Sequence, residues 1–183
     1  MKKVCVLLAD GFEEIEALTV VDLLRRAKVY VDTVSITDDY TVRGAHGIPV
    51  QTEDLITEID FKESDMIVLP GGMPGTTNLK EDENVRKAVQ EAYDDGRYVA
   101  AICAAPTILA DMGLLKGKRA TCYPDMESEI EDAYLTGAPV ATDENIITSQ
   151  GVGTAIDFAL KLIEVLISEE KAVEIADSIV YQR

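Results

Sequence analysis

The chain has 183 residues, of which 47% are hydrophobic and 28% charged, a balance that excludes a disordered protein. Its formal net charge of −17 disfavours binding to nucleic acid or to an anionic membrane surface, because both carry negative charge. With no linker, repeat or low-complexity segment, residues 1–183 are expected to form one domain. Residues 125–132 carry only acids among their charged side chains, and we expect a solvated, mobile face there rather than a metal site.

The first apolar run covers residues 4–9 and ends at Asp10. It is too short for an export signal or a membrane span, so we predict a strand. The three cysteines, Cys5, Cys103 and Cys122, show neither CxxC spacing nor an even count. Without an export signal they fit reduced thiols, which predicts a cytoplasmic protein.

Strand-like and helix-like segments alternate along the chain. In chain order we predict a strand at 3–8, a helix at 13–27, strands at 30–36 and 65–69, a helix at 83–93, a strand at 98–102, a helix at 106–112, strands at 119–122 and 145–149, and helices at 153–167 and 169–179. Residues 38–63 are less regular, with β-prone pieces near 40–42 and 48–50. This order predicts an α/β fold with a mostly parallel sheet covered by helices.

Sites in such sheets form outside the carboxyl ends of the strands. Five places follow predicted strands, and they are residues 10–13, 70–75, Cys103, 123–124 and 150–153. Three of them contain glycine, which permits a close approach of the backbone to a ligand. The last two bring Tyr123, Gln150 and Gly151 to this edge as candidate lining residues.

Cys103 lies between a predicted strand and a predicted helix that begins at Pro106. A side chain at such a turn is lifted clear of the backbone and faces a helix N-terminus, which favours an anion. The thiol should therefore ionise more easily than a free cysteine, and the thiolate is the nucleophile. The small residues Ala101, Ala104 and Ala105 fit a nucleophile elbow with cysteine in place of serine. The alternative is a buried core cysteine that packs as a small hydrophobe.

Gly71 and Gly72 follow the strand predicted at 65–69. Their backbone N–H groups, together with that of Ala104, could form an oxyanion hole beside Cys103. The alternative is a turn that only needs a positive φ. Neither a G-x-G-x-x-G nor a Walker A pattern occurs, so a phosphate-binding motif is not supported.

Glu16 shares an apolar helical line with four residues that should face inward, namely Val20, Leu23, Leu24 and Ala27. A buried carboxylate is costly unless it is protonated or hydrogen-bonded. A raised pKa would let a neutral Glu16 donate a hydrogen bond to a thiolate. The alternative is that Glu13, Glu14 and Glu16 complement the helix dipole, which we prefer for Glu13 and Glu14 and leave open for Glu16.

The single histidine, His46, lies in a loop and not at a predicted strand end. Cysteine hydrolases usually need a base beside the thiol. We expect a loop contact for His46, which disfavours a papain-like triad.

Four segments in this order resemble the DJ-1/PfpI superfamily over nearly the whole chain, and they are residues 10–16, 69–72, 101–106 and 148–154. Within it the chain looks closest to the DJ-1-like bacterial proteins sometimes labelled ThiJ or thiazole-phosphate biosynthesis enzymes. The resemblance implies a flavodoxin-like three-layer sandwich, like that of class I glutamine amidotransferases, which commonly dimerises through the first helix. It also implies that Cys103 is readily oxidised to sulfinate, that a protonated Glu16 bonds to its sulfur, and that Gly72 and Ala104 supply N–H groups.

Three positions depart from patterns in the superfamily. Some members carry a histidine at the position of Tyr123 and an arginine at that of Gln150, so a base and an anion contact are absent here. The PfpI branch usually has a histidine at the position of Ala104, which makes proteolysis doubtful.

We therefore expect a cytoplasmic homodimer whose Cys103 thiolate attacks an α-oxoaldehyde, with Glu16 moving protons, in glyoxalase- or deglycase-type chemistry. No metal or organic cofactor is expected; the partners would be a small carbonyl substrate or an oxidant. The rival hypothesis is a non-enzymatic redox sensor or redox-regulated chaperone that acts through oxidation of Cys103. An amidohydrolase or peptidase is the least favoured class.

Overall fold

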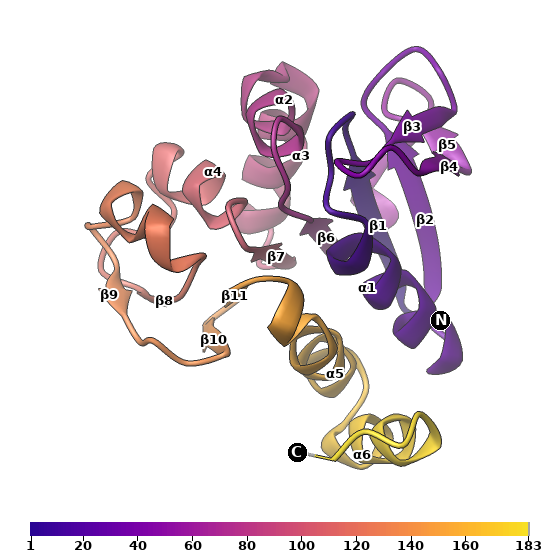
Figure 1. Cartoon of the computed structure of the whole chain (residues 1–183), viewed down its shortest axis with the longest axis vertical. Helices are drawn as coiled ribbons and strands as arrows, with labels where there is room; N and C mark the ends of the chain where they lie inside the picture. Colours follow the sequence, from indigo (N-terminus) through magenta and orange to yellow (C-terminus); the bar gives the residue numbers. More distant parts are fainter. Residues whose placement is uncertain (183) are drawn as a thin grey trace.

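A seven-stranded sheet forms the middle layer of the protein, whose computed structural model describes residues 1–182 (Figure 1). The strand order is β10-β11-β7-β6-β1-β2-β5. The strands are β1 (Lys3–Leu8), β2 (Tyr30–Ser35), β5 (Asp54–Leu55), β6 (Met66–Leu69), β7 (Tyr98–Ile102), β10 (Val140–Asp143) and β11 (Ile146–Ser149). All neighbours pair in parallel except β10, which is antiparallel to β11. The predicted mostly parallel sheet is confirmed, and the order β2-β1-β6-β7-β11 is the flavodoxin-like one.

Helices cover both faces of this sheet (Figure 1). One face carries α1 (Glu14–Arg26), α5 (Ala155–Leu166) and α6 (Glu169–Ser178), and the other carries α2 (Gly75–Glu81), α3 (Glu83–Asp94) and α4 (Pro106–Asp111). Successive residues of β1 enter different cores, because side chains alternate along a strand. Val6 packs with Phe158 of α5 in one core, and Leu7 packs with Leu109 of α4 in the other. The predicted three-layer α/β sandwich is thus confirmed.

Two small sheets and three short 3-10 helices lie outside the middle layer. They are β3 (Thr41–Arg43) with β4 (Pro49–Gln51), β8 (Arg119–Ala120) with β9 (Tyr134–Leu135), η1 (Phe61–Glu63), η2 (Pro124–Glu129) and η3 (Val152–Thr154). The strand predicted at 119–122 is wrong in length and place, because β8 has two residues and pairs with β9. The backbone N–H of Thr121 donates instead to the side chain of Thr148, at 2.9 Å. The acidic segment begins within η2, which buried Ile130 follows.

Helix α2 has no counterpart in the sequence-based prediction. Its sequence GTTNLKE contains glycine, asparagine and two threonines, which are weak helix formers. Burial of Leu79 stabilises α2 despite this weak helix propensity, since Leu79 is fully buried in the core shared with α3 and α4. The short strands β5, β9 and β10 were likewise not predicted.

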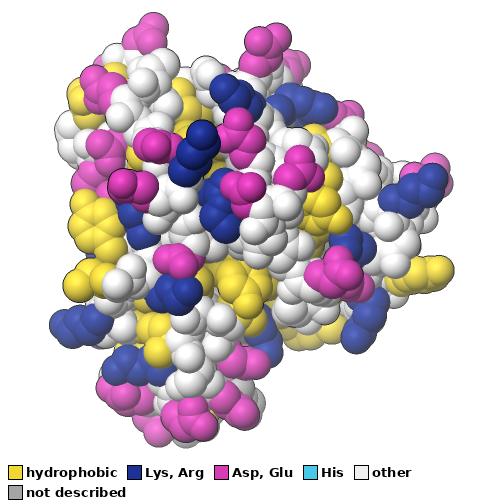
Figure 2. Space-filling model, turned by 180° about the vertical axis from the view of Figure 1, so that it is seen from behind, with side chains coloured by type: hydrophobic (Ala, Val, Ile, Leu, Met, Phe, Trp, Pro, Cys, Tyr) yellow, Lys and Arg dark blue, Asp and Glu magenta, His cyan; other side chains and the backbone are white. Residues whose placement is uncertain are grey.

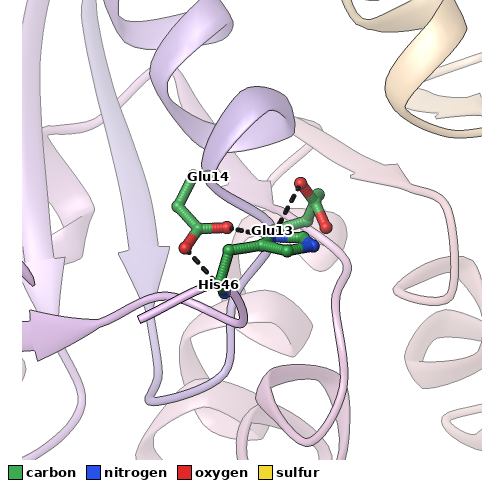
Figure 3. Close-up of side chains that lie close together, drawn as sticks. All are labelled: Glu13, Glu14 and His46. Carbon is green, nitrogen blue, oxygen red and sulfur yellow. Dashed lines mark hydrogen bonds and ion pairs between the residues drawn. The ribbon is translucent and has the colours of Figure 1, made fainter. Parts of the chain in front are cut away.

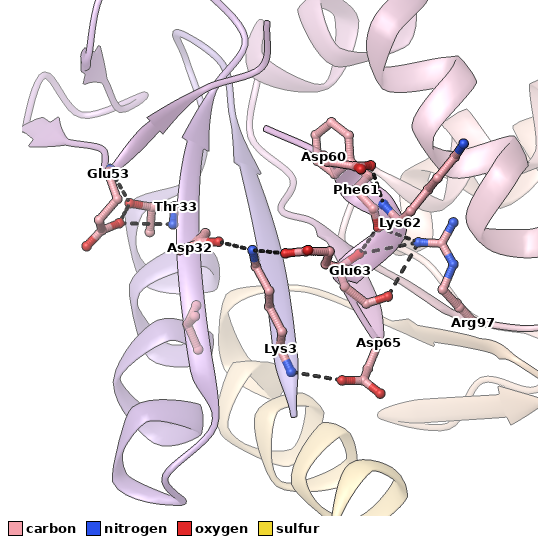
Figure 4. Close-up of polar contacts among 12 residues, drawn as sticks. Lys3, Asp32, Thr33, Glu53, Asp60, Phe61, Lys62, Glu63, Asp65 and Arg97 are labelled. Atoms are coloured by element: carbon pink, nitrogen blue, oxygen red, sulfur yellow. Dashed lines mark hydrogen bonds and ion pairs between the residues drawn. The ribbon is translucent and has the colours of Figure 1, made fainter. Parts of the chain in front are cut away.

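A network of polar contacts holds the amino ends of the strands, away from the edge where sites are expected (Figure 4). Lys3 Nζ lies 3.1 Å from the buried Asp32 carboxylate of β2. The carboxylate of Asp65 accepts the backbone N–H of Lys3 at 2.9 Å, and the Arg97 guanidinium donates to the Phe61 carbonyl at 2.6 Å. These contacts tie β1, β2 and the start of β7 to the segment that leads into β6.

Acidic side chains are interspersed with lysine and arginine on the face shown in Figure 2. Thirteen ion pairs join described residues, and most of them lie at the surface. Among residues 1–182, no helix has the length and apolar character needed to cross a membrane.

The neighbouring lysines Lys2 and Lys3 provide a matched test of the polar network. Lys3→Ala should lower the free energy of unfolding by about 2 kcal/mol or more, because Asp32, whose side chain is 3% exposed, loses its cation. Lys2→Ala should cost less than about 1 kcal/mol, because the Lys2–Asp65 pair is largely solvated. Urea unfolding of both variants measures the difference, and equal losses would contradict the assigned role of Lys3.

Candidate active site

Cys103 follows β7 with a backbone φ of +66°. This left-handed conformation costs a non-glycine residue roughly 1 kcal/mol or more and persists where the surroundings fix it. Here the N–H of Cys103 donates to the Ser149 carbonyl at 3.0 Å, and its carbonyl accepts the N–H of Tyr123 at 2.8 Å. The sharp turn predicted for a nucleophile elbow is present. The Cys103 side chain is half-buried, whereas Cys5 and Cys122 are buried.

Glu16 lies in the first turn of α1 and is fully buried. Its Oε2 atom accepts the backbone N–H of Gly71 at 2.9 Å. Its Oε1 atom has no hydrogen-bond partner among the described residues, and a Cβ atom at Gly151 would lie 3.8 Å from both this oxygen and the Cys103 sulfur. Glu16 therefore faces the sulfur, which the helical pattern alone left open.

The loop after β6 approaches the thiol closely because it contains glycine. A Cβ atom at Gly71 would lie 2.6 Å from the Cβ of Cys103 and 2.7 Å from Oε2 of Glu16. The oxyanion role predicted for Gly71 does not hold, because Glu16 already occupies its N–H. The N–H groups of Ala104 and Gly72 lie near enough to the Cys103 sulfur to lower the pKa of the thiol.

The two ionisable groups shift each other's pKa. Burial raises the pKa of Glu16 to about 7, partly offset by hydrogen bonds from Cys103 and Gly71. Burial raises the pKa of the Cys103 thiol to about 12, and an ionised Glu16 acts in the same direction. The prediction of an acidic thiol is therefore wrong. A proton on Glu16 removes the repulsion and leaves the N–H groups of Ala104 and Gly72 to lower the thiol pKa, but burial, the largest cause, still raises it.

A cavity of about 420 Å³ opens above the sulfur. The predicted lining residues Tyr123, Gln150 and Gly151 border it together with Cys103, Glu16 and Gly72. Glu13, which was expected only to complement the helix dipole, also forms part of the wall. Its position just after the first strand was the available signal. Residues 152–154 complete the wall, held by a hydrogen bond between the Ser149 and Thr154 hydroxyls at 2.7 Å.

His46 lies outside the cavity wall and contacts the start of α1, consistent with the loop contact predicted for it (Figure 3). Its Nδ1 atom is 2.8 Å from Oε2 of Glu14, and its backbone N–H donates to Oε1 of Glu14 at 2.8 Å. Glu13 Oε1 lies 3.7 Å from Nδ1. Within residues 1–182 these three form the one group of His, Cys, Asp or Glu spaced to hold a metal ion. Their hydrogen bonds already account for the arrangement, which fastens the 44–47 loop to α1.

Residues 2–165 match the model of the DJ-1/PfpI family. The protein DJ-1 homolog B of Arabidopsis thaliana is 40% identical over 181 residues, which cover 98% of this chain and 41% of that protein. The glutathione-independent glyoxalase DJ-1 of Schizosaccharomyces pombe is 34% identical over 182 residues, with 93% of this chain and 94% of that protein covered. The structure of oxidized Toxoplasma gondii DJ-1 superposes with a TM-score of 0.95 at 36% identity and covers all of both chains.

The raised pKa of Glu16 predicts a pH-dependent stability. Between its ordinary pKa of 4.5 and about 7, the folded protein keeps the Glu16 proton that the unfolded chain loses. The free energy of unfolding should therefore fall by up to about 3 kcal/mol as the pH rises through this window. Glu16→Gln should remove this contribution, whereas Glu169→Gln on the exposed surface of α6 should retain it. Denaturant unfolding at pH 4.5 and 7.5 measures the change in the free energy of unfolding for each protein. An equal change in wild type and Glu16→Gln would contradict the raised pKa assigned to Glu16.

Proposed function

This chain belongs to the DJ-1/PfpI family, and we propose that it is a cysteine-dependent enzyme that acts on small α-oxoaldehydes such as methylglyoxal. The observation that carries the proposal is the half-buried Cys103 thiol facing the fully buried Glu16 carboxyl group. The S. pombe relative named a glutathione-independent glyoxalase supports the same chemistry.

The first step is addition of the Cys103 thiolate to the aldehyde carbon. A carbon–sulfur bond forms, and the carbonyl electrons move onto oxygen. The N–H groups of Gly72 and Ala104 would stabilise this oxyanion, and their effect in lowering the thiol pKa supports that role. Neutral Glu16 then supplies the proton that completes the hemithioacetal.

The second step moves a proton between two carbons. Ionised Glu16 takes the proton from the carbon bonded to sulfur, and the electron pair moves onto the neighbouring carbonyl oxygen to give an enediolate. A proton then passes between the two oxygens of the enediolate, and Glu16 returns its proton to the neighbouring carbon. The product is a thioester of a 2-hydroxy acid, which water cleaves to the free acid and the thiol. One aldehyde and one water thus give one hydroxy acid, and no redox partner is consumed.

Glu16 suits this task better than the other groups nearby. A general acid–base catalyst works best when its pKa is near the working pH, and the pKa of Glu16 is raised to about 7. Tyr123 also lines the cavity, but it is 45% exposed to solvent, whereas Glu16 is fully buried beside the sulfur. No histidine is among the described residues that line the cavity, which argues against a cysteine hydrolase.

A second candidate function is redox sensing, because Cys103 is the one cysteine of the chain that is partly exposed. Peroxide would transfer one oxygen atom to the thiolate to form sulfenate and release water after protonation, and a second peroxide would form sulfinate. The Toxoplasma gondii DJ-1 structure is of an oxidized protein, which supports this chemistry in a relative.

The protein is further proposed to act as a homodimer in the reducing cytoplasm. Ile15 and Leu18 of α1 are 52% and 36% exposed, which gives this helix an apolar patch suited to self-association.

The curated relatives differ in length, and this chain spans less than half of the Arabidopsis protein, so a further activity of that protein is not transferred to it.

Turnover of methylglyoxal without glutathione tests the enzymatic proposal. Cys103→Ser should abolish formation of lactate, and Glu16→Gln should lower kcat by about 10²- to 10⁴-fold, the effect of losing a proton-transfer group. Cys122→Ser is the matched control, because Cys122 is buried outside the cavity wall, and it should keep its activity. Full activity of Cys103→Ser, or no turnover by the wild type, would refute the proposal.

Limited oxidation tests the redox candidate. At low peroxide, Cys103 should form sulfinate before Cys5 and Cys122 react, because Cys103 is partly exposed to solvent and the other two cysteines are buried. Peptide mass mapping after timed exposure measures the order. Earlier oxidation of Cys5 would contradict the assignment of Cys103 as the reactive thiol.

A further inference from the structure

The charged residue types in the wall of the Cys103 cavity are all acidic. Among the described residues that line it, Glu13 and Glu16 carry carboxyl groups, and no lysine, arginine or histidine is present. The other lining residues are uncharged, and the polar side chains among them include Tyr123 and Gln150. An electrophile that reaches the sulfur therefore meets acidic groups without a compensating cation in the wall.

Glu13 and Glu16 differ in how they can contribute. Glu16 is fully buried and can hold a proton, so its charge changes during the proposed reaction. Glu13 precedes α1 with its side chain 14% exposed, and its backbone N–H is fixed by the Gly71 carbonyl at 2.8 Å. The nearest basic group is His46, 3.7 Å away, which is bound more closely by Glu14. The Arg43 guanidinium donates to the Gly47 carbonyl, at 2.8 Å.

We propose that Glu13 makes the cavity selective for uncharged electrophiles over anionic ones. As applied to substrates, the inference rests on the proposed function and specifies it: α-oxoaldehydes without a charged group are accepted, and those carrying a carboxylate or phosphate are disfavoured. A fixed negative charge in a wall that excludes part of the water repels an anion more strongly than the same charge in bulk water. The net charge of −17 adds a weaker repulsion that salt screens.

Iodoacetamide and iodoacetate test this selectivity directly. The two reagents are similar in size and alkylate the same sulfur with loss of iodide, but only iodoacetate is anionic. The quantity measured is the ratio of their second-order rate constants at Cys103, at one pH and ionic strength. The same ratio for 2-mercaptoethanol gives the intrinsic preference. Changes in thiol pKa or in the folded fraction alter both rates together and cancel in the ratio.

The wild-type ratio should exceed that of 2-mercaptoethanol by about tenfold, the scale of one unit charge at a partly solvated site. Glu13→Gln should lower the ratio at least about threefold. Glu169→Gln is the matched control. Glu169 begins α6, beyond the end of α5 that is far from the cavity, so the substitution removes one negative charge at a distance and should leave the ratio unchanged. Gln150→Arg, which adds a cation to the wall, should lower the ratio further.

Two outcomes would overturn the inference: a wild-type ratio equal to that of 2-mercaptoethanol, or the same ratio in Glu13→Gln and Glu169→Gln. The measurement does not depend on catalysis. If only the enzymatic proposal fails, methylglyoxal is not turned over but the alkylation ratio still shows the charge preference. If only the selectivity inference fails, methylglyoxal is turned over but the alkylation ratio shows no charge preference.

Discussion

The carboxyl group of Glu16 is completely removed from water, and such a group must keep its proton or gain hydrogen-bond donors. It does so at the ends of two adjacent strands, where Gly71 after β6 donates its N–H and Cys103 after β7 presents its thiol. The same loop binds α1 in return, because the Gly71 carbonyl accepts the N–H of Glu13. The start of α1, the glycine loop and the elbow are therefore fixed relative to one another by a single buried group.

The sheet topology makes this meeting possible. Strand order reverses between β1 and β6, so their following loops diverge and leave room for a site at the carboxyl edge. Contacts at the opposite edge, such as the Lys3–Asp32 ion pair, hold the strands together there. The protein thus separates the groups that stabilise its sheet from those that do its chemistry.

The central sheet and most of its flanking helices could be predicted from the sequence, since apolar runs and strand-end positions are local signals. The helical pattern left the position of Glu16 beside Cys103 open, and only the family resemblance implied it. Helix α2 could not be predicted, because its weak propensity is overcome by burial of Leu79, which only the folded chain supplies. The role of Gly71 was missed for a related reason: a glycine turn does not reveal which acceptor its N–H will meet. Glu13 looked like a helix-end charge because sequence spacing does not show the cavity beside it.

The fixed backbone at Cys103 also constrains how this site can change through mutation. The elbow is held at both its N–H and its carbonyl, and Gly71 leaves no space for a side chain against it. Substitutions in this inner layer would therefore displace the nucleophile itself. Glu13, Tyr123 and Gln150 contribute side chains to the wall, where a replacement alters shape or charge without moving the sulfur. New substrate preferences are consequently accessible by single steps at the rim, on a reaction centre that stays the same.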